Sequence, residues 1–171
     1  MRALLNSISF EQLLWLIPIF LTIHNIEEVP FMEGWSRRLP IKLPLTITKR
    51  QFVIAVTVIT LAGFALTYVG VEYLANRTGY LLVLGMQAIL LVNAFIPHLA
   101  TTIRFRMYSP GVITAVLITL PFSFYLFRRA FEENILSWSQ FWTLFGVAPF
   151  AMVIIALLSL QLGKAFEKKP V

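Results

Sequence analysis

Two histidines and two adjacent glutamates are the residues of this sequence best suited to chemistry. His24, Glu27 and Glu28 lie in the stretch TIHNIEEVPF, and His98 lies in NAFIPHLATT. The chain of 171 residues has no other histidine and only eight acidic residues, so these groups are few and concentrated. Helical residues three and four apart share a face, so the first three side chains project from one arc of a helix. This pattern predicts a polar site.

A bound divalent metal ion is the first chemistry that these side chains predict. His24 and Glu28 have the spacing of the two histidine ligands in H-x-x-E-H zinc peptidases, with Glu28 in place of the second histidine. His98 is expected as the third ligand. Two histidines and one glutamate suit a catalytic zinc, iron or manganese ion with a position left open for water. Glu27 is then expected to be catalytic, as the general base.

Two other classes of function use the same residues without a metal ion. In a metal-free acid/base enzyme, one glutamate would protonate an alkene, an epoxide or a headgroup oxygen of a lipid while His24 relays the proton. In a non-catalytic protein, the cluster would bind a lipid or small molecule, or would only fix the packing of an accessory membrane protein. Metal analysis separates the first class from these two, and the sequence leaves the substrate and the reaction open.

The composition predicts the element type that positions these residues. Hydrophobic residues make up 58% of the chain and the mean hydropathy is +0.81, far above a soluble domain. We expect an all-α, polytopic transmembrane helix bundle forming a single domain over residues 1–171, with residues 32–50 as an ordered or interfacial loop. The hydropathy pattern predicts about five spans, at residues 11–31, 51–75, 80–103, 111–128 and 141–163.

Basic residues predict the orientation of these spans. Four lie in the segments of one side, and ten lie in the segments of the other: Arg37, Arg38, Lys42, Lys49, Arg50, Arg104, Arg106, Lys164, Lys168 and Lys169. Lysine and arginine are enriched on the cytoplasmic side of membrane proteins. We therefore expect a multi-pass protein of the cell membrane with its N-terminus outside and its C-terminus in the cytoplasm.

This orientation predicts that the polar residues of two spans meet at one depth. The first and third spans both run inward, which puts His24 roughly 20 Å along the first and His98 about 27 Å along the third. Asn93 is expected to support the site from the third span. The segment RMYSPGVIT follows, so Tyr108 and Thr114 are expected as further supporting residues at the inner mouth.

The composition also excludes several kinds of site and partner. The sequence has no cysteine, so thiolate metal sites and cysteine nucleophiles are excluded. It has no aspartate, which excludes a paired-aspartate protease. The net charge of +6 does not predict a nucleic-acid partner, because the basic residues lie in short connections between apolar spans. Membrane lipids are the expected partners, and the oligomeric state stays open.

The sequence resembles a known family at these positions. His24-Asn25-Ile26-Glu27-Glu28 resembles the signature of the HXXEE family of small bacterial integral membrane proteins, and NAFIPH and YSPGVITA are similar to the rest of its pattern. The resemblance covers roughly residues 11–130. It implies a membrane protein of that size and no particular reaction, so the chemistry rests on the residues themselves.

Overall fold

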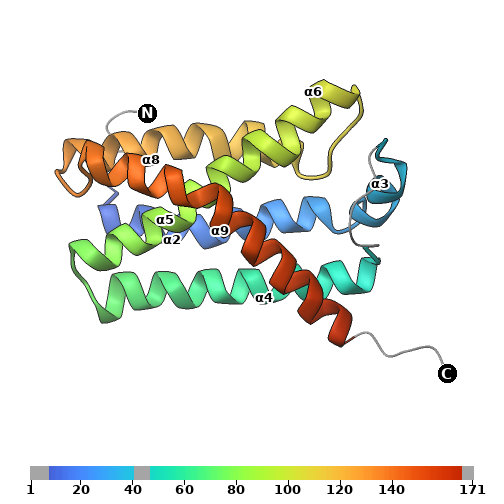
Figure 1. Cartoon of the computed structure of the whole chain (residues 1–171). Coiled ribbons are helices and arrows are strands. Elements are labelled where there is room, and N and C mark those ends of the chain that lie inside the picture. Colours follow the sequence, from blue (N-terminus) through green and yellow to red (C-terminus); the bar gives the residue numbers. More distant parts are fainter. Residues whose placement is uncertain (1–7, 41–46, 167–171) are drawn as a thin grey trace.

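The protein is a bundle of long helices, which confirms the predicted fold class. The computed structural model describes residues 8–40 and 47–166, and within these ranges all regular structure is helical. The helices before residue 94 are α2 (Phe10–Glu28), α3 (Met32–Arg38), α4 (Lys49–Tyr68), η1 (Val69–Tyr73) and α5 (Arg77–Asn93). They are followed by η2 (Ala94–Ala100), α6 (Thr101–Phe105), α7 (Val112–Thr114), η3 (Ala115–Thr119), α8 (Leu120–Glu132) and α9 (Trp138–Ala165) (Figure 1).

The long helices meet the length and hydropathy required for a membrane span. Four continuous stretches in the described part of the chain do so: Lys49–Tyr73, Arg77–Phe105, Val112–Glu132 and Trp138–Ala165. A fifth span is present if α2 and α3 are taken together, although the two helices are bent by 62° relative to each other. The described part of the chain therefore has four such spans, or the predicted five if the bent pair α2–α3 is one span.

Short polar residues explain where several of these helices begin. The side chains of Ser9, Thr48, Asn76 and Ser137 each accept a hydrogen bond from a backbone N–H in the first turn of the helix that follows. Such N-caps satisfy amide groups that have no partner within the helix. These caps fix the beginnings of α2, α4, α5 and α9.

The end of the first span differs from the sequence prediction. We expected a span over residues 11–31 and a loop over residues 32–50, but α2 ends at Glu28 and residues 32–38 form α3. Pro30 explains the break, because it has no N–H to continue the ladder and its ring clashes with the preceding turn. The break leaves Glu28 on the last turn of α2, beside the connection to α3.

Two hydrophobic clusters hold the bundle together. The larger one lies among α2, α5, α8 and the first half of α9, and its most buried members are Leu13, Leu14, Ile17, Val83, Leu84 and Leu126. The smaller one joins Met32, Ile47, Phe52 and Val56 at the other end, next to α3. This smaller cluster lines one cavity together with four polar residues, His24, Glu28, Asn93 and His98.

Wide π-helical turns interrupt the third span where it carries His98. In η2 the ring of Pro97 prevents the regular ladder, and a wide turn relieves the clash with the carbonyl four residues earlier. In a regular α-helix, residues 93 and 98 would point about 140° apart. The wider winding of η2 brings them to one face, and Asn93 Nδ2 lies 2.8 Å from His98 Nε2.

Helix α9 crosses the bundle at an angle (Figure 1). Near its end it touches α4 closely: a Cβ on Gly163 would lie 2.4 Å from the carbonyl oxygen of Gln51, so only glycine fits there. The amide of Gln51 also donates to the carbonyl of Leu160 at 2.8 Å. Beyond its crossing with α5, α9 runs toward the beginning of α4, whereas η2 and α6 run away from it (Figure 1). The second half of α9 and the segment η2–α6 therefore diverge.

Candidate metal centre

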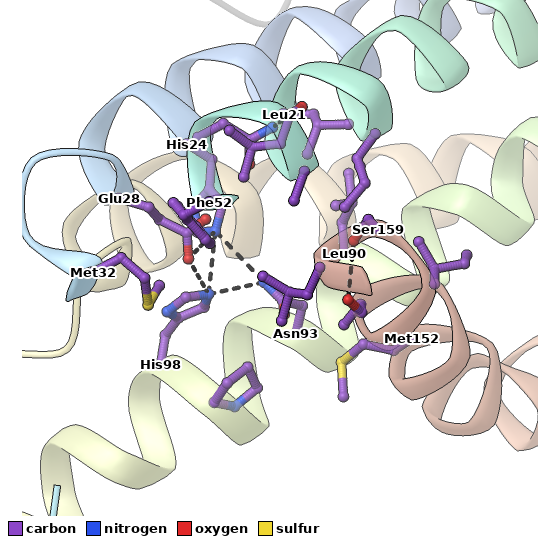
Figure 2. Close-up of a pocket in the computed structure, with 18 of the residues that line it drawn as sticks. Leu21, His24, Glu28, Met32, Phe52, Leu90, Asn93, His98, Met152 and Ser159 are labelled. Atoms are coloured by element: carbon purple, nitrogen blue, oxygen red, sulfur yellow. Dashed lines mark hydrogen bonds and ion pairs between the residues drawn. The ribbon is translucent and has the colours of Figure 1, made fainter. Parts of the chain in front are cut away.

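Three buried side chains from two helices converge on one point. His24 and Glu28 come from consecutive turns of α2, and His98 comes from η2 (Figure 2). Their exposed fractions are 5%, 7% and 3%. His24 Nε2 lies 3.1 Å from His98 Nε2 and 3.8 Å from Glu28 Oε1, and His98 Nε2 lies 3.5 Å from the same oxygen. The structure thus brings together the three ligands expected from the sequence.

The size of this triangle suits a metal ion. A point in its plane lies about 2.0 Å from all three atoms, which is the usual bond length from zinc to histidine nitrogen and carboxylate oxygen. Ligand atoms of a tetrahedral ion with bonds of about 2.1 Å are about 3.4 Å apart, and those of an octahedral ion about 3.0 Å. The three distances, 3.1, 3.5 and 3.8 Å, average nearer the tetrahedral value.

Asn93 completes the polar surface around this point. Its side-chain nitrogen lies 2.8 Å from His98 Nε2 and 3.5 Å from His24 Nε2. The two ends of an amide are exchangeable by rotation, so Asn93 can present either its N–H or its oxygen to the centre. The structure thus places Asn93 beside both imidazoles, where it could act either as a hydrogen-bond donor or as an additional oxygen ligand.

Thr114 determines which ring nitrogen of His24 carries the proton. Thr114 Oγ1 lies 2.6 Å from Glu27 Oε2 and 2.8 Å from His24 Nδ1. The single hydroxyl proton goes to the near, charged carboxylate, so the hydroxyl oxygen accepts the proton of His24 Nδ1. That tautomer leaves a lone pair on Nε2, the atom that faces Glu28 and His98. Hydrogen bonds of this kind orient and polarise metal-binding histidines.

Glu27 does not occupy the place expected of a general base. Its carboxylate does not line the cavity beside the three ligands. Four donors satisfy it: the hydroxyls of Tyr108 and Thr114, each at 2.6 Å, and the backbone N–H groups of Ile113 and Thr114 at 3.1 and 2.8 Å. The carboxylate caps the beginning of α7 and joins α2 to it. Geometry therefore gives Glu27 a positioning role, unlike the catalytic role expected from the sequence.

Tyr108 lies farther out, in the connection that follows α6. Burial and the hydrogen bond to Glu27 raise the pKa of Tyr108 to about 12, so its hydroxyl stays protonated and remains a donor. The side chain is 41% exposed and does not line the cavity. Tyr108 thus supports Glu27 and, through Thr114, the orientation of His24, without touching the centre itself.

Gly111 is the site residue that sequence reasoning missed. The Ser109-Pro110-Gly111 segment forms a turn, in which the N–H of Val112 donates to the carbonyl of Ser109. However, Gly111 has φ +87°, a conformation that favours glycine. A Cβ there would lie 2.7 Å from His24 Cε1, 2.9 Å from His98 Cε1 and 3.1 Å from Glu28 Cγ. Gly111 therefore forms the wall behind all three ligands.

The polar groups close one end of a largely apolar cavity of about 380 Å³. His24, Glu28, Asn93 and His98 point toward one another at this end (Figure 2). The apolar walls come from α3, α4, α5 and α9, and they include Met32, Phe52, Val56, Ile59, Leu90, Met152 and Ile155. A concave apolar pocket with a few convergent polar groups is typical of a small-molecule site.

Removal of the Thr114 hydroxyl is expected to weaken metal binding about 10- to 100-fold, the usual range when the hydrogen-bond partner of a metal ligand is lost. Thr114→Val keeps the shape of the side chain but leaves His24 Nδ1 without its acceptor. The measurement is a metal titration of chelator-treated protein in detergent. Thr114→Ser should restore binding, and Thr22→Val, which removes a hydroxyl bonded only within α2, should leave it unchanged. Equal metal affinity in Thr114→Val and wild type would show that Thr114 does not orient His24 as a ligand.

Comparisons with known proteins place the chain in a family. The sequence model described as "Protein of unknown function with HXXEE motif" matches residues 15–126. The chain is also 27% identical over 141 residues to a Bacillus subtilis (strain 168) protein named uncharacterized protein YrkK, covering 82% of this chain and 87% of the relative. No solved structure matches it. The family match spans all three ligand positions, Asn93, Gly111 and Thr114, and it ends before α9. The chain therefore belongs to the HXXEE family.

Proposed function

We propose that this protein is a metal-dependent membrane enzyme that acts on a lipid or another hydrophobic substrate. The observation that carries the proposal is the triangle of His24 Nε2, His98 Nε2 and Glu28 Oε1, which has the size of a metal coordination shell and faces an apolar cavity. Packed membrane helices rarely bury such groups without a function, because each costs free energy to place there.

The residues around the triangle have separate roles in this proposal. His24, Glu28 and His98 hold a divalent zinc, iron or manganese ion, which when bound supplies Lewis acidity and activates water. Thr114 and Glu27 orient His24. Asn93 is close enough to both imidazoles to bind a polar atom of the substrate or to occupy a further ligand position. The apolar walls keep bulk water from the reacting group, which strengthens electrostatic interactions there.

Elemental analysis of the purified protein tests this proposal. Protein prepared in detergent without chelators is expected to carry about one zinc, iron or manganese ion per chain. Removal of the ion should lower the melting temperature, and return of the same ion should restore it, because a ligand that binds only the folded state stabilises it. Protein that carries none of the three metals and gains no stability from any of them would overturn the proposal.

A metal-free acid/base enzyme is the second candidate, and a specific observation favours it. A continuous set of contacts joins the cavity to the exposed Tyr108, passing from Glu28 through His98 and His24 to Thr114 and Glu27. Such a chain can move a proton between the cavity and water. Under this scheme Glu28 exchanges a proton with the substrate, and the histidines return it. A metal-free wild type in the elemental analysis would leave this candidate in place.

The orientation in the membrane is also part of the proposal. The beginning of α4, the ends of α6 and α9, and helix α3 lie at one end of the bundle (Figure 1). This end carries most of the described basic residues: Arg37, Arg38, Lys49, Arg50, Arg104, Arg106 and Lys164. The excess of positive charge supports a cytoplasmic location for this end. The candidate metal centre would then lie toward the inner leaflet.

A further inference from the structure

We propose that the cavity binds a single-chain membrane lipid whose polar group is uncharged, such as a fatty acyl ester, alcohol or aldehyde. The chain lies between α4 and α9, and the polar group lies against His24, Glu28 and His98. The reaction of that polar group rests on the proposed function. Binding of the lipid itself depends only on the shape, opening and charge of the cavity.

The cavity opens sideways through the wall formed by α9. Ile155 and Ala156 both line the cavity, yet both are exposed on the surface, Ile155 to 41%. They lie about 26 Å from the start of this helix, so the opening is within the thickness of the membrane. A lipid can therefore reach the cavity from the bilayer without crossing water.

The protein groups that line the cavity do not favour a phosphate headgroup. Among the described residues that line it, none is Lys or Arg, and the ionisable ones are His24, His98 and Glu28. Protein sites for phosphate supply cationic or multiple N–H donors to pair the anion. A phosphodiester at this end would lose its hydration, and its one cationic partner would be the proposed metal ion, whose charge the Glu28 carboxylate already partly neutralises. An ester, hydroxyl or aldehyde oxygen carries a smaller desolvation cost.

The volume agrees with one chain. The cavity of about 380 Å³ lies in the lower part of the roughly 300–1,000 Å³ range of ligand pockets, which suits one chain better than the two of a phospholipid.

Photolabelling in vesicles tests this inference. Two probes carry the same diazirine- and alkyne-bearing acyl chain, one as a methyl ester and the other within phosphatidylcholine. The ester is expected to label cavity-lining residues of α4 and α9, including Phe52, Ile59 and Met152. Phosphatidylcholine is expected to label only lipid-facing residues. Excess unlabelled methyl oleate should reduce ester labelling of the cavity several-fold, and excess unlabelled phosphatidylcholine should not.

A matched pair of substitutions on α9 locates the binding. Ala156→Trp places a large ring at the opening and should reduce ester labelling of the cavity several-fold. Leu158→Trp, which points outward from the same helix and is 60% exposed in the native chain, should leave it unchanged. Equal labelling of the cavity by both probes would overturn the inference, as would ester labelling that survives competition. The competition arm uses wild-type protein, so it decides the question even if Ala156→Trp does not fold.

The same preparation separates this inference from the metal proposal. Labelling is measured with and without chelator treatment, and metal content is measured on the same samples. Ester labelling of the cavity in untreated protein that carries no metal, and that gains no stability from zinc, iron or manganese, would support the lipid site and remove the metal assignment. A protein with one bound metal ion per chain and no ester labelling of the cavity would retain the metal centre and exclude a neutral lipid as its substrate.

Discussion

Glu28→Gln is expected to lower metal affinity by about 100-fold or more, the largest loss among single substitutions that preserve side-chain size. Glu28 is the single anionic member of the triangle, and its Oε1 lies 3.5 and 3.8 Å from the two imidazole nitrogens. A glutamine has the same shape but no charge to neutralise a divalent ion. Metal content by elemental analysis, together with a titration of chelator-treated protein, measures the effect.

The adjacent Glu27→Gln is the matched control for this substitution. Glu27 touches no ligand atom of the triangle except through Thr114, and glutamine retains one acceptor oxygen. We expect Glu27→Gln to keep most of the metal and to lower the melting temperature, because one of its four donors then faces an amide N–H. Equal metal content in Glu28→Gln and wild type would show that the ion, if present, binds elsewhere.

Gly111→Ala is expected to disrupt the centre and to destabilise the protein by about 1–3 kcal/mol. Two independent effects add at this position. The backbone has φ +87°, which is strained for alanine, and the new methyl group would lie within 3.1 Å of all three proposed metal ligands. Both imidazole rings would have to move, and with them the nitrogen atoms that form the triangle. Metal affinity and melting temperature should fall together.

Gly146→Ala controls for the loss of a glycine in a helix. A Cβ at Gly146 meets no atom within 4 Å, so this variant should keep the metal and melt at or above the wild-type temperature. If Gly111→Ala retains wild-type metal affinity, the positions of His24, Glu28 and His98 do not depend on the close approach of Gly111. The three side chains would then be able to move apart without loss of the ion. Measurement of both variants in the same detergent makes the comparison direct.

Residue type and depth were enough to predict which side chains meet. His24, Glu28 and His98 stand out because ionisable groups are rare in apolar spans, and the helical rise places them at one depth. The hydrogen-bonding role of Glu27 could not be predicted in this way. Its spacing from His24 places it on the same arc, but its partners, Tyr108 and the start of α7, lie more than 80 residues away.

Other features depend on backbone geometry that hydropathy does not encode. The cavity is lined by residues of α3, α4, α5, η2 and α9, whereas span prediction gives only the length of each helix and not how the helices cross. The bend after Glu28 is readable from Pro30, but the charged and proline-rich composition of residues 32–50 predicts a loop where helix α3 forms. Gly111 could have been suspected from its place after Ser-Pro, since such a turn often needs a left-handed residue. That a Cβ at this position would meet His24, Glu28 and His98 follows only from the folded structure.

The wide turn of η2 means that segment length, as well as residue identity, encodes the centre. Deleting one residue between Asn93 and Pro97 would leave a span nearly as long and as apolar as Arg77–Phe105, and every motif residue would still be present. In a regular α-helix the shortened segment would place His98 four residues after Asn93, about 40° away and still on the same face. The wide turn is therefore what four intervening residues require, and a relative with three residues there and a regular helix can keep the same arrangement. The residue count together with the helix type is a better test for this site than the motif alone.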